Sequence, residues 1–286
     1  MKTIIAAALL LAMPLQAQDF QGMAVYESKT STSDISRRMD AAKDLTPEMR
    51  AMAESMMKQA FEKTFVLHFD QSASVYKEEE KLDAPGQAQQ PGLRMMTSMT
   101  GGGGTFYKNV KDKTYTVDKE FMGKEFLVKD TLAQLKWNMG SETRQIGGYT
   151  CYKATAVRPV SKSDIRNYRP RQQREPAKEK TTGIMTEIDI PDNTTVTAWY
   201  TPEIPVSHGP ENYWGLPGLI LEANDGKTAI LCSKVVLNPK EKTAIKPPTS
   251  GKVVSQKEYD ETVVKKMEEL REMQGRNGGF QMRFGQ

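Results

Sequence analysis

Residues 219–237, which read LILEANDGKTAILCSKVVL, predict a β-hairpin. Two apolar runs, residues 219–223 and 230–237, flank the pair Asp225-Gly226. An Asp-Gly pair between two strand-like runs is a strong signal for a tight turn, because both residues tolerate positive φ. We therefore expect two antiparallel strands that meet at this turn.

The same two-residue alternation of apolar side chains extends over much of the chain. Phe65, Leu67 and Phe69 fall on one face of a strand, and Val75 continues the run after a bend. Further strands are expected within residues 105–129, 146–157 and 196–200, where apolar residues recur at strand spacing. Short strands that follow one another closely in this way are typical of antiparallel pairs.

Two segments have the period of a helix instead. Residues 46–61 place four methionines on one helical stripe, and Thr46 followed by Pro47 marks the start. Near the C-terminus, Ser255 and Glu258 form a capping box ahead of a second apolar stripe. The predicted fold class is therefore α+β: a curved, mostly antiparallel sheet, open or half-barrel, with an inserted N-terminal amphipathic helix and a C-terminal helix.

The first 17 residues have the pattern of a secretory signal peptide. Lys2 precedes an apolar run over residues 4–13, and cleavage is expected near Ala17. The run is too short to cross a bilayer, which needs about 20 residues. We expect a periplasmic or secreted protein that does not span the membrane, with one domain over residues 18–274 and a disordered tail over residues 275–286.

Two stretches interrupt the pattern of strands. Residues 82–104 contain two Pro-Gly pairs and end in four consecutive glycines, which is typical of a flexible loop. Residues 158–180 are rich in lysine and arginine and also predict a flexible loop. The loop is either a solvated charged segment or a docking site for an acidic surface, such as anionic lipid or a partner protein.

Charge and cysteine content narrow the class of protein further. The net charge of +4 over 286 residues is close to zero and argues against nucleic acid as a partner. The two cysteines, Cys151 and Cys232, are read as a disulfide in an exported chain, with two free buried thiols as the alternative.

No pattern of residues identifies an enzyme. His68 and His208 are the only imidazoles, and no serine lies in a GxSxG elbow. Neither CxxC nor HxxxH occurs, and the glycine run lacks the context of a phosphate-binding loop, so no metal or cofactor is expected. Asp130-Thr131-Leu132 resembles the short acidic threonine motif that some Gram-negative bacteria O-glycosylate in the periplasm.

Residues 198–222 read AWYTPEIPVSHGPENYWGLPGLILE, and here the chain resembles the GLPGLI family through the hexapeptide at residues 215–220. The resemblance extends upstream to residues 146–154, which read IGGYTCYKA. It implies a secreted or periplasmic GLPGLI-type domain of uncharacterised activity. At the level of fold, the order of strands and turns is also similar to that of LolA-type lipoprotein carriers, which implies an apolar cavity enclosed by a curved sheet.

We predict from this a non-enzymatic envelope protein that holds an apolar ligand, such as a lipid or peptide, or that docks to an outer-membrane protein. An exported hydrolase with unidentified catalytic residues and a purely structural accessory module are the alternatives. The candidate ligand contacts combine the methionine stripe with the hexapeptide region: Met52, Met56, Trp199, Trp214, Leu216 and Pro217.

Overall fold

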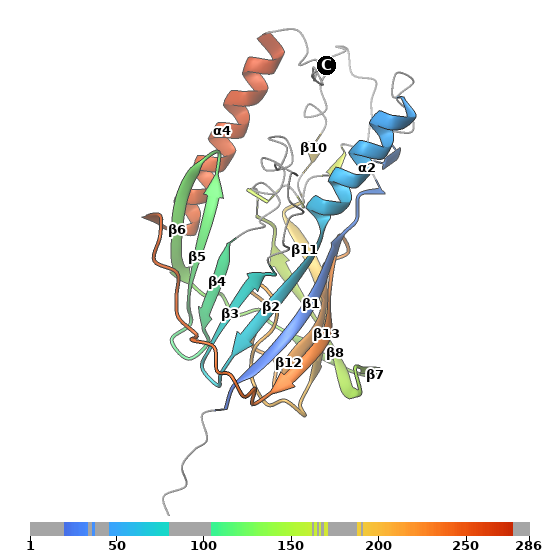
Figure 1. Ribbon diagram of the computed structural model, residues 1–286, viewed down its shortest axis with the longest axis vertical. Helices are drawn as coiled ribbons and strands as arrows, with labels where there is room; N and C mark the ends of the chain where they lie inside the picture. The colour runs from blue at the N-terminus through green and yellow to red at the C-terminus, as the bar shows by residue number, and fades with distance from the viewer. Residues whose placement is uncertain are drawn as a thin grey trace, which may run out of the picture.

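Twelve strands of the protein join into one long sheet, seen in a computed structural model (Figure 1). The structure describes residues 20–33, 36–37, 46–79, 104–161, 163–164, 166, 169–170, 188–189 and 191–276. The twelve strands of this sheet are β1 (Gly22–Thr30), β2 (Glu62–Phe69), β3 (Ala73–Glu78), β4 (Thr105–Asn109), β5 (Thr114–Phe121), β6 (Lys124–Thr131), β7 (Asn138–Ile146), β8 (Tyr149–Pro159), β11 (Asn193–Thr201), β12 (Leu219–Asn224), β13 (Thr228–Leu237) and β14 (Lys252–Val254). Two further short strands, β9 (Arg169–Pro170) and β10 (Ile188–Asp189), pair only with each other.

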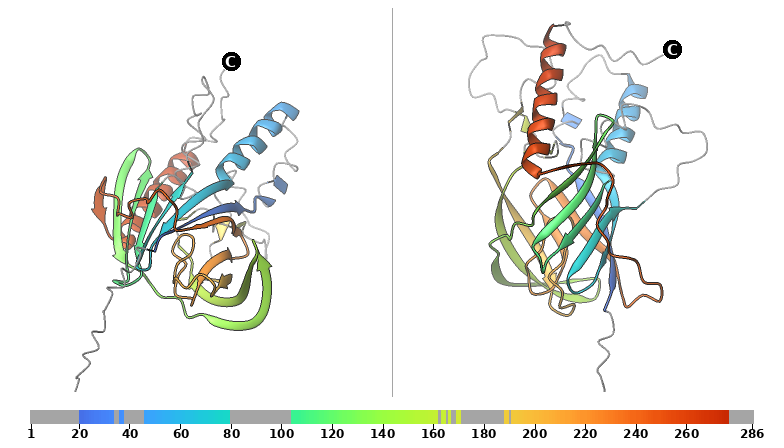
Figure 2. Two further views of the ribbon diagram at one scale, coloured as in Figure 1. Left: turned by 60° about the horizontal axis from the view of Figure 1, so that its bottom comes forward. Right: turned by 90° about the vertical axis from the view of Figure 1, so that its left-hand side faces the viewer.

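The order of the strands places both halves of the chain side by side. The order is β14-β6-β5-β4-β3-β2-β1-β13-β12-β11-β8-β7, and all pairs are antiparallel except β14 with β6. The first strand pairs with β13, so the N-terminal and C-terminal parts of the sheet are joined at its middle. The sheet curves strongly without closing, and its two ends are β14 and β7 (Figure 2).

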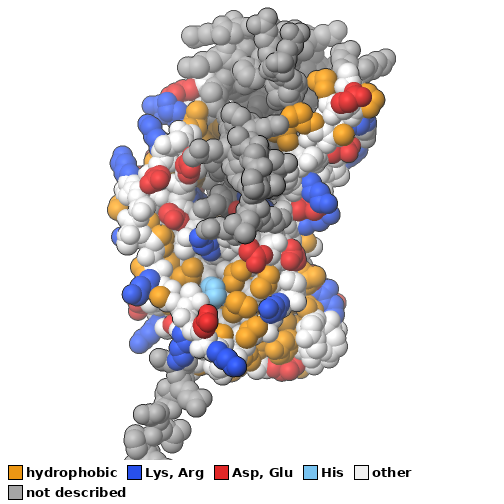
Figure 3. All heavy atoms as spheres, viewed as in Figure 1, with side chains coloured by type: hydrophobic (Ala, Val, Ile, Leu, Met, Phe, Trp, Pro, Cys, Tyr) orange, Lys and Arg blue, Asp and Glu red, His pale blue; other side chains and the backbone are white. Residues whose placement is uncertain are grey.

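Alternation of side chains along each strand separates a buried concave face from an outer face. Along β2, Phe65, Leu67 and Phe69 are buried and the residues between them are partly exposed, as the sequence pattern predicts. The predicted hairpin is also confirmed, because β12 and β13 pair around the turn at Asp225-Gly226. On the outer face, partly exposed hydrophobic side chains gather over β1 and its neighbours (Figure 3).

The concave face is filled by the chain itself. Residues 202–218, which connect β11 to β12 and are called the central loop below, lie inside the curve of the sheet (Figure 2). Ile204, Val206, Tyr213 and Leu216 of this loop join the main hydrophobic core, with at most 4 % of their surface exposed. The hydrophobic core therefore fills the space in which the similarity to lipoprotein carriers predicts an apolar cavity.

Two helices are described, and both begin where the sequence predicts. Helix α2 (Pro47–Phe61) is capped by Thr46, whose side chain accepts a hydrogen bond from the Met49 amide at 3.3 Å. Helix α4 (Gln256–Arg276) begins with the predicted capping box: the Ser255 amide donates to the Glu258 carboxylate at 2.7 Å, and the Glu258 amide donates to Ser255 Oγ at 3.2 Å.

The α+β class predicted from the sequence is wrong, because the protein is mostly β-sheet. Only the last turns of α2 are buried, through Met57, Ala60 and Phe61. Helix α4 covers β5 and β6 with Tyr259 and Val263 and then projects beyond the sheet (Figure 1). Periodicity finds a helix correctly, but it does not tell how much of the core that helix covers.

The expectations for the cysteines and for the start of the C-terminal tail differ from the structure, and several other expectations fall on residues that it does not describe. Cys151 and Cys232 are free, buried thiols, so the predicted disulfide is not formed in this structure. Helix α4 extends to Arg276, into the predicted tail. The predicted signal peptide, nearly all of the loop at 82–104, most of 158–180 and residues 277–286 lie outside the described residues.

Candidate functional site

The six predicted ligand contacts do not form one site. Met52 and Met56 are half-buried on α2, at the end of the sheet where both helices project. Trp199 lies on β11, where the Arg144 guanidinium stacks over its ring at 4.3 Å and also pairs with Glu222. The remaining three residues belong to the central loop: Trp214 and Leu216 are buried and Pro217 is exposed.

The hexapeptide region has a structural role in the central loop. A Cβ added at Gly218 would lie 2.1 Å from the backbone oxygen of Thr201, so only glycine fits there. Trp214 donates from Nε1 to the carbonyl of Ala133 at 2.9 Å, and Trp137 donates from its own Nε1 to the carbonyl of Trp214 at 2.8 Å. These contacts fasten the loop to the segment that connects β6 to β7.

A buried lysine also anchors the central loop. Lys108 of β4 is fully buried, and its Nζ donates to the carbonyl oxygens of Gly209, Glu211 and Tyr213 at 2.5, 2.7 and 3.1 Å. Three acceptors match the three donors of a lysine ammonium. Burial lowers the pKa of Lys108 to about 7, while the nearby Glu211 carboxylate acts in the opposite sense.

Several polar atoms around this anchor find no hydrogen-bond partner among the residues that the structure describes. They are the two ring nitrogens of His208 and the hydroxyls of Ser74 and Tyr76, all of them buried. Burial lowers the pKa of His208 to about 3, and the Lys108 charge adds to the shift, so the imidazole is neutral at physiological pH. A neutral imidazole with no exposed surface is not placed to act on a substrate in solution.

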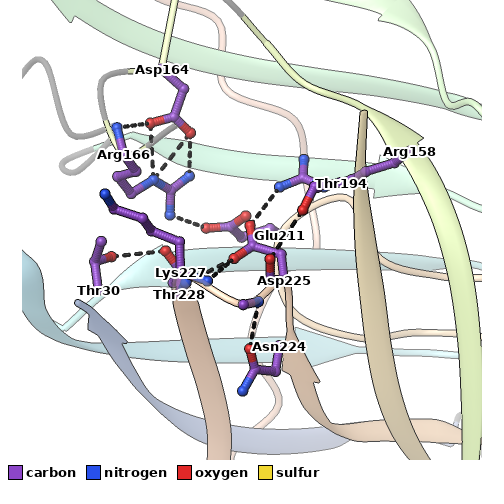
Figure 4. Close-up of polar contacts among 11 residues, drawn as sticks. Thr30, Arg158, Asp164, Arg166, Thr194, Glu211, Asn224, Asp225, Lys227 and Thr228 are labelled. Atoms are coloured by element: carbon purple, nitrogen blue, oxygen red, sulfur yellow. Dashed lines mark hydrogen bonds and ion pairs between the residues drawn. The ribbon is translucent and has the colours of Figure 1, made fainter. Parts of the chain in front are cut away.

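Charged residues close one end of the concave face; Arg158, Asp164, Arg166, Glu211 and Asp225 are called the polar mouth below (Figure 4). They come from β8, the segment after it, the central loop and the turn of the β12–β13 hairpin. Arg158, Asp164 and Arg166 fall within the basic loop predicted at residues 158–180, but no single member of the polar mouth was predicted, because a charged side chain is by default expected to be solvated. Only the alternation in β4, which puts Lys108 on the same face as the partly buried Phe106, signals a buried charge.

Asp225 fixes the hairpin turn. Its Oδ1 accepts hydrogen bonds from the amides of Lys227 and Thr228 at 3.0 and 2.7 Å, and its Oδ2 pairs with Arg158 at 3.1 Å. The carbonyl of Asp225 accepts a hydrogen bond from Thr194 Oγ1 at 3.0 Å (Figure 4). The tip of the hairpin is therefore held rigidly by side chains from two other strands.

Arg166 links the segment after β8 to the central loop. It binds Asp164 through Nε and Nη2, at 2.8 to 3.1 Å, and Glu211 through Nη1 at 2.7 Å. Burial alone would raise the pKa of Asp164, but the charge and hydrogen bonds of Arg166 outweigh it and lower that pKa. The pKa of Arg166 is raised by the two carboxylates against the effect of burial. Asp164 and Arg166 are therefore ionised at neutral pH, which suits a structural tie better than proton transfer.

An open groove lies beside the polar mouth, between α2 and the tip of the hairpin. Its volume is about 550 Å³, within the range of small-molecule sites. Met57 and Phe61 of α2 form its apolar wall, and Ala229 contributes from β13. The groove is also lined by Lys29, Thr30, Ser31, Thr32, Ser33, Ser36, Glu54, Lys58, Glu62, Asn224, Gly226 and Lys227.

The remaining reactive groups are inert at neutral pH. Burial raises the pKa of Cys151 to about 11 and that of Cys232 to about 12, so both thiols are protonated. Among the residues that the structure describes, no three His, Cys, Asp or Glu side chains are grouped so as to hold a metal ion. In the same part of the chain, no helix has the length and apolar character needed to cross a membrane.

Comparison with known proteins gives a family match over part of the chain. Residues 137–222 match the family described as "Protein of unknown function (Porph_ging)". No curated protein matches the sequence.

Two solved structures of PNGF-II, in space groups C2 and P21, resemble the fold with a TM-score of 0.46 at 14 % and 13 % identity. Each comparison covers 86 % of this chain but only 33 % of the PNGF-II chain, so the protein spans about a third of their length. These two structures are of PNGF-II and not of the lipoprotein carriers named above.

Proposed function

We propose that the protein is a non-enzymatic binding protein of the cell envelope that holds an apolar ligand in the groove between α2 and the β12–β13 hairpin. The groove is the observation that carries this proposal. We also propose that the chain belongs to the GLPGLI family; the hexapeptide lies within the matched residues 137–222, which supports this.

The filled concave face directs the ligand to the groove. A lipoprotein carrier would need an empty interior, whereas here the central loop occupies that space and Lys108 anchors it. Expelling Ile204, Val206, Tyr213 and Leu216 would cost roughly 1.5–3 kcal/mol for each side chain. A ligand of modest affinity does not supply that free energy, so it binds outside the core.

The two walls of the groove suit an apolar ligand in different ways. The hairpin wall is rigid, because Asp225 and Arg158 fix its turn. The helical wall offers Met57, and methionine adapts to irregular apolar shapes because its side chain is long and unbranched. A fixed wall lowers the cost of ordering the site, and an adaptable wall allows more than one chain length to fit.

Titration with decanoate tests the proposal. Ala229 is exposed and lines the groove, so Ala229→Trp fills the space without removing a core side chain. Leu231 lies two residues along the same strand, is 44 % exposed and does not line the groove, so Leu231→Trp is the matched control.

We expect calorimetry to show binding to the unmodified protein, binding at least tenfold weaker to Ala229→Trp, and unchanged binding to Leu231→Trp. Absence of binding to the unmodified protein, or equal binding by all three proteins, would contradict the proposal.

A further inference from the structure

The end of β6 presents an exposed hydroxyl next to a carboxylate. Asp130 is the only aspartate in the sequence that is followed directly by serine or threonine. Thr131 is exposed at the last position of β6, whereas Leu132, the next residue, is 4 % exposed and holds the backbone against the protein. The threonine is thus displayed on a fixed strand end, where a modifying enzyme can reach it.

Asp130 orients the threonine on this strand end. Oδ1 of Asp130 accepts hydrogen bonds from the amide of Thr131 at 2.7 Å and from its Oγ1 at 3.3 Å. Oδ2 accepts a hydrogen bond from the amide of Gln256, at the start of α4, at 3.0 Å. Because the hydroxyl hydrogen points to the carboxylate, the lone pairs of Thr131 Oγ1 face away from it.

The carboxylate is held in its ionised form. The hydrogen bond from the Thr131 amide is the main cause that lowers the pKa of Asp130. Burial opposes it, and the hydrogen bonds from the Gln256 amide and the Thr131 hydroxyl lower the pKa further. A negative charge beside an exposed hydroxyl is a feature that a modifying enzyme can recognise. Thr114, the cross-strand neighbour of Thr131, is also exposed but follows Lys113, so it lacks this feature.

We propose that Thr131 is an O-glycosylation site, modified in the periplasm through its Oγ1. The donor is a sugar carried on a lipid diphosphate, which is the class of donor available outside the cytoplasm. Oγ1 forms a bond to the anomeric carbon of the sugar while the bond from that carbon to the diphosphate oxygen breaks. The diphosphate leaves with the electron pair, and the hydroxyl proton passes to a base of the transferase. The inference rests on the envelope location that is part of the proposed function, but it does not depend on the groove or its ligand.

Intact mass of the protein, purified from the envelope of the bacterium that encodes it, tests the proposal. We expect a mass above that of the processed polypeptide, and we expect Thr131→Ala to return the mass to the polypeptide value. Thr131→Ser keeps the hydroxyl and retains the added mass, and Thr114→Ala, the matched control, also retains it. Substitutions at these exposed positions change stability by about 0.5 kcal/mol or less, so folding does not confound the comparison.

Asp130→Asn tests the role of the carboxylate separately. The amide oxygen can still accept the hydrogen bond from the Gln256 backbone, but the negative charge is removed. We expect the added mass to be lost in this variant. A wild-type mass equal to that of the polypeptide, or an added mass that persists in Thr131→Ala, overturns the site; persistence in Asp130→Asn overturns the role of the carboxylate.

Discussion

Replacing Lys108 by methionine tests whether this residue anchors the central loop as a buried, easily deprotonated amine. The change removes the donor for the three carbonyl oxygens of Gly209, Glu211 and Tyr213. A neutral amine has two N–H donors and satisfies two of these oxygens, and each buried acceptor left unpaired costs about 1 kcal/mol or more. The variant therefore loses about 2 kcal/mol relative to a protein with a neutral Lys108.

The pH dependence of stability separates the cost of the unpaired carbonyl oxygens from the cost of burying the charge of Lys108. The pKa of Lys108 is about 7 in the folded protein and 10.5 in an ordinary lysine, so the unfolded state binds the proton more tightly between these values. Stability from this group is therefore complete above pH 10.5 and is lost as the pH falls toward 7. Between pH 7.0 and 9.5, wild type should gain about 3 kcal/mol relative to Lys108→Met.

Urea unfolding followed by tryptophan fluorescence at pH 7.0 and 9.5 measures this difference. Lys129→Met is the control, because Lys129 is an exposed lysine on β6 and should show the same pH dependence as wild type. If the difference between wild type and Lys108→Met is the same at both pH values, the three carbonyl oxygens keep Lys108 charged and the reasoning about burial is wrong.

Three further predictions address other buried groups. The pKa of His208 is lowered to about 3, so its protonation opposes folding of the wild type as the pH falls below 6.5. The difference in the free energy of unfolding between His208→Leu and wild type, measured in urea, should therefore shift by about 2 kcal/mol in favour of the variant from pH 8 to pH 5. Gly218→Ala should lower the free energy of unfolding by about 3 kcal/mol or more. Gly140→Ala should lower it by about 1 kcal/mol or less, because the added Cβ is 3.4 Å from its nearest neighbour. Equal melting temperatures of the two variants would refute this prediction. Cys151 and Cys232 should not react with a thiol reagent in the native protein at pH 8. In urea without reductant, two equivalents of thiol per protein should react, whereas zero equivalents would reveal a disulfide.

Local features of the fold were predictable from the sequence. The turn at Asp225-Gly226, the Thr46 cap and the Ser255 capping box each depend on residues within a few positions of one another, and all three are present. The fold class was not predictable in the same way. It depends on how much of each helix is covered by the sheet, and that contact involves residues far apart in the chain.

The candidate site was less predictable than the fold. The methionine stripe on α2 was found, but the groove uses Met57 and Phe61 and not Met52 or Met56, because the direction in which the helix packs decides which part of the stripe faces the hairpin. The anchor at Lys108 joins residues about 100 positions apart, and the ion pairs of the polar mouth join four segments. No local pattern encodes pairs of this kind, since each partner alone has the composition of a solvated surface.

The pairing of β1 with β13 has a consequence for the order in which the protein folds. Residues 22–30 have their final neighbours on one side only after residues 228–237 have been synthesised, and Tyr26 donates a hydrogen bond to the carbonyl of Ile220, 194 positions away. Long-range contacts of this kind slow folding, because a large loop must close before they form. When the ribosome has synthesised three quarters of the chain, β13 is still missing and β1 cannot yet pair with it. Nascent chains truncated before β13 should therefore remain protease-sensitive.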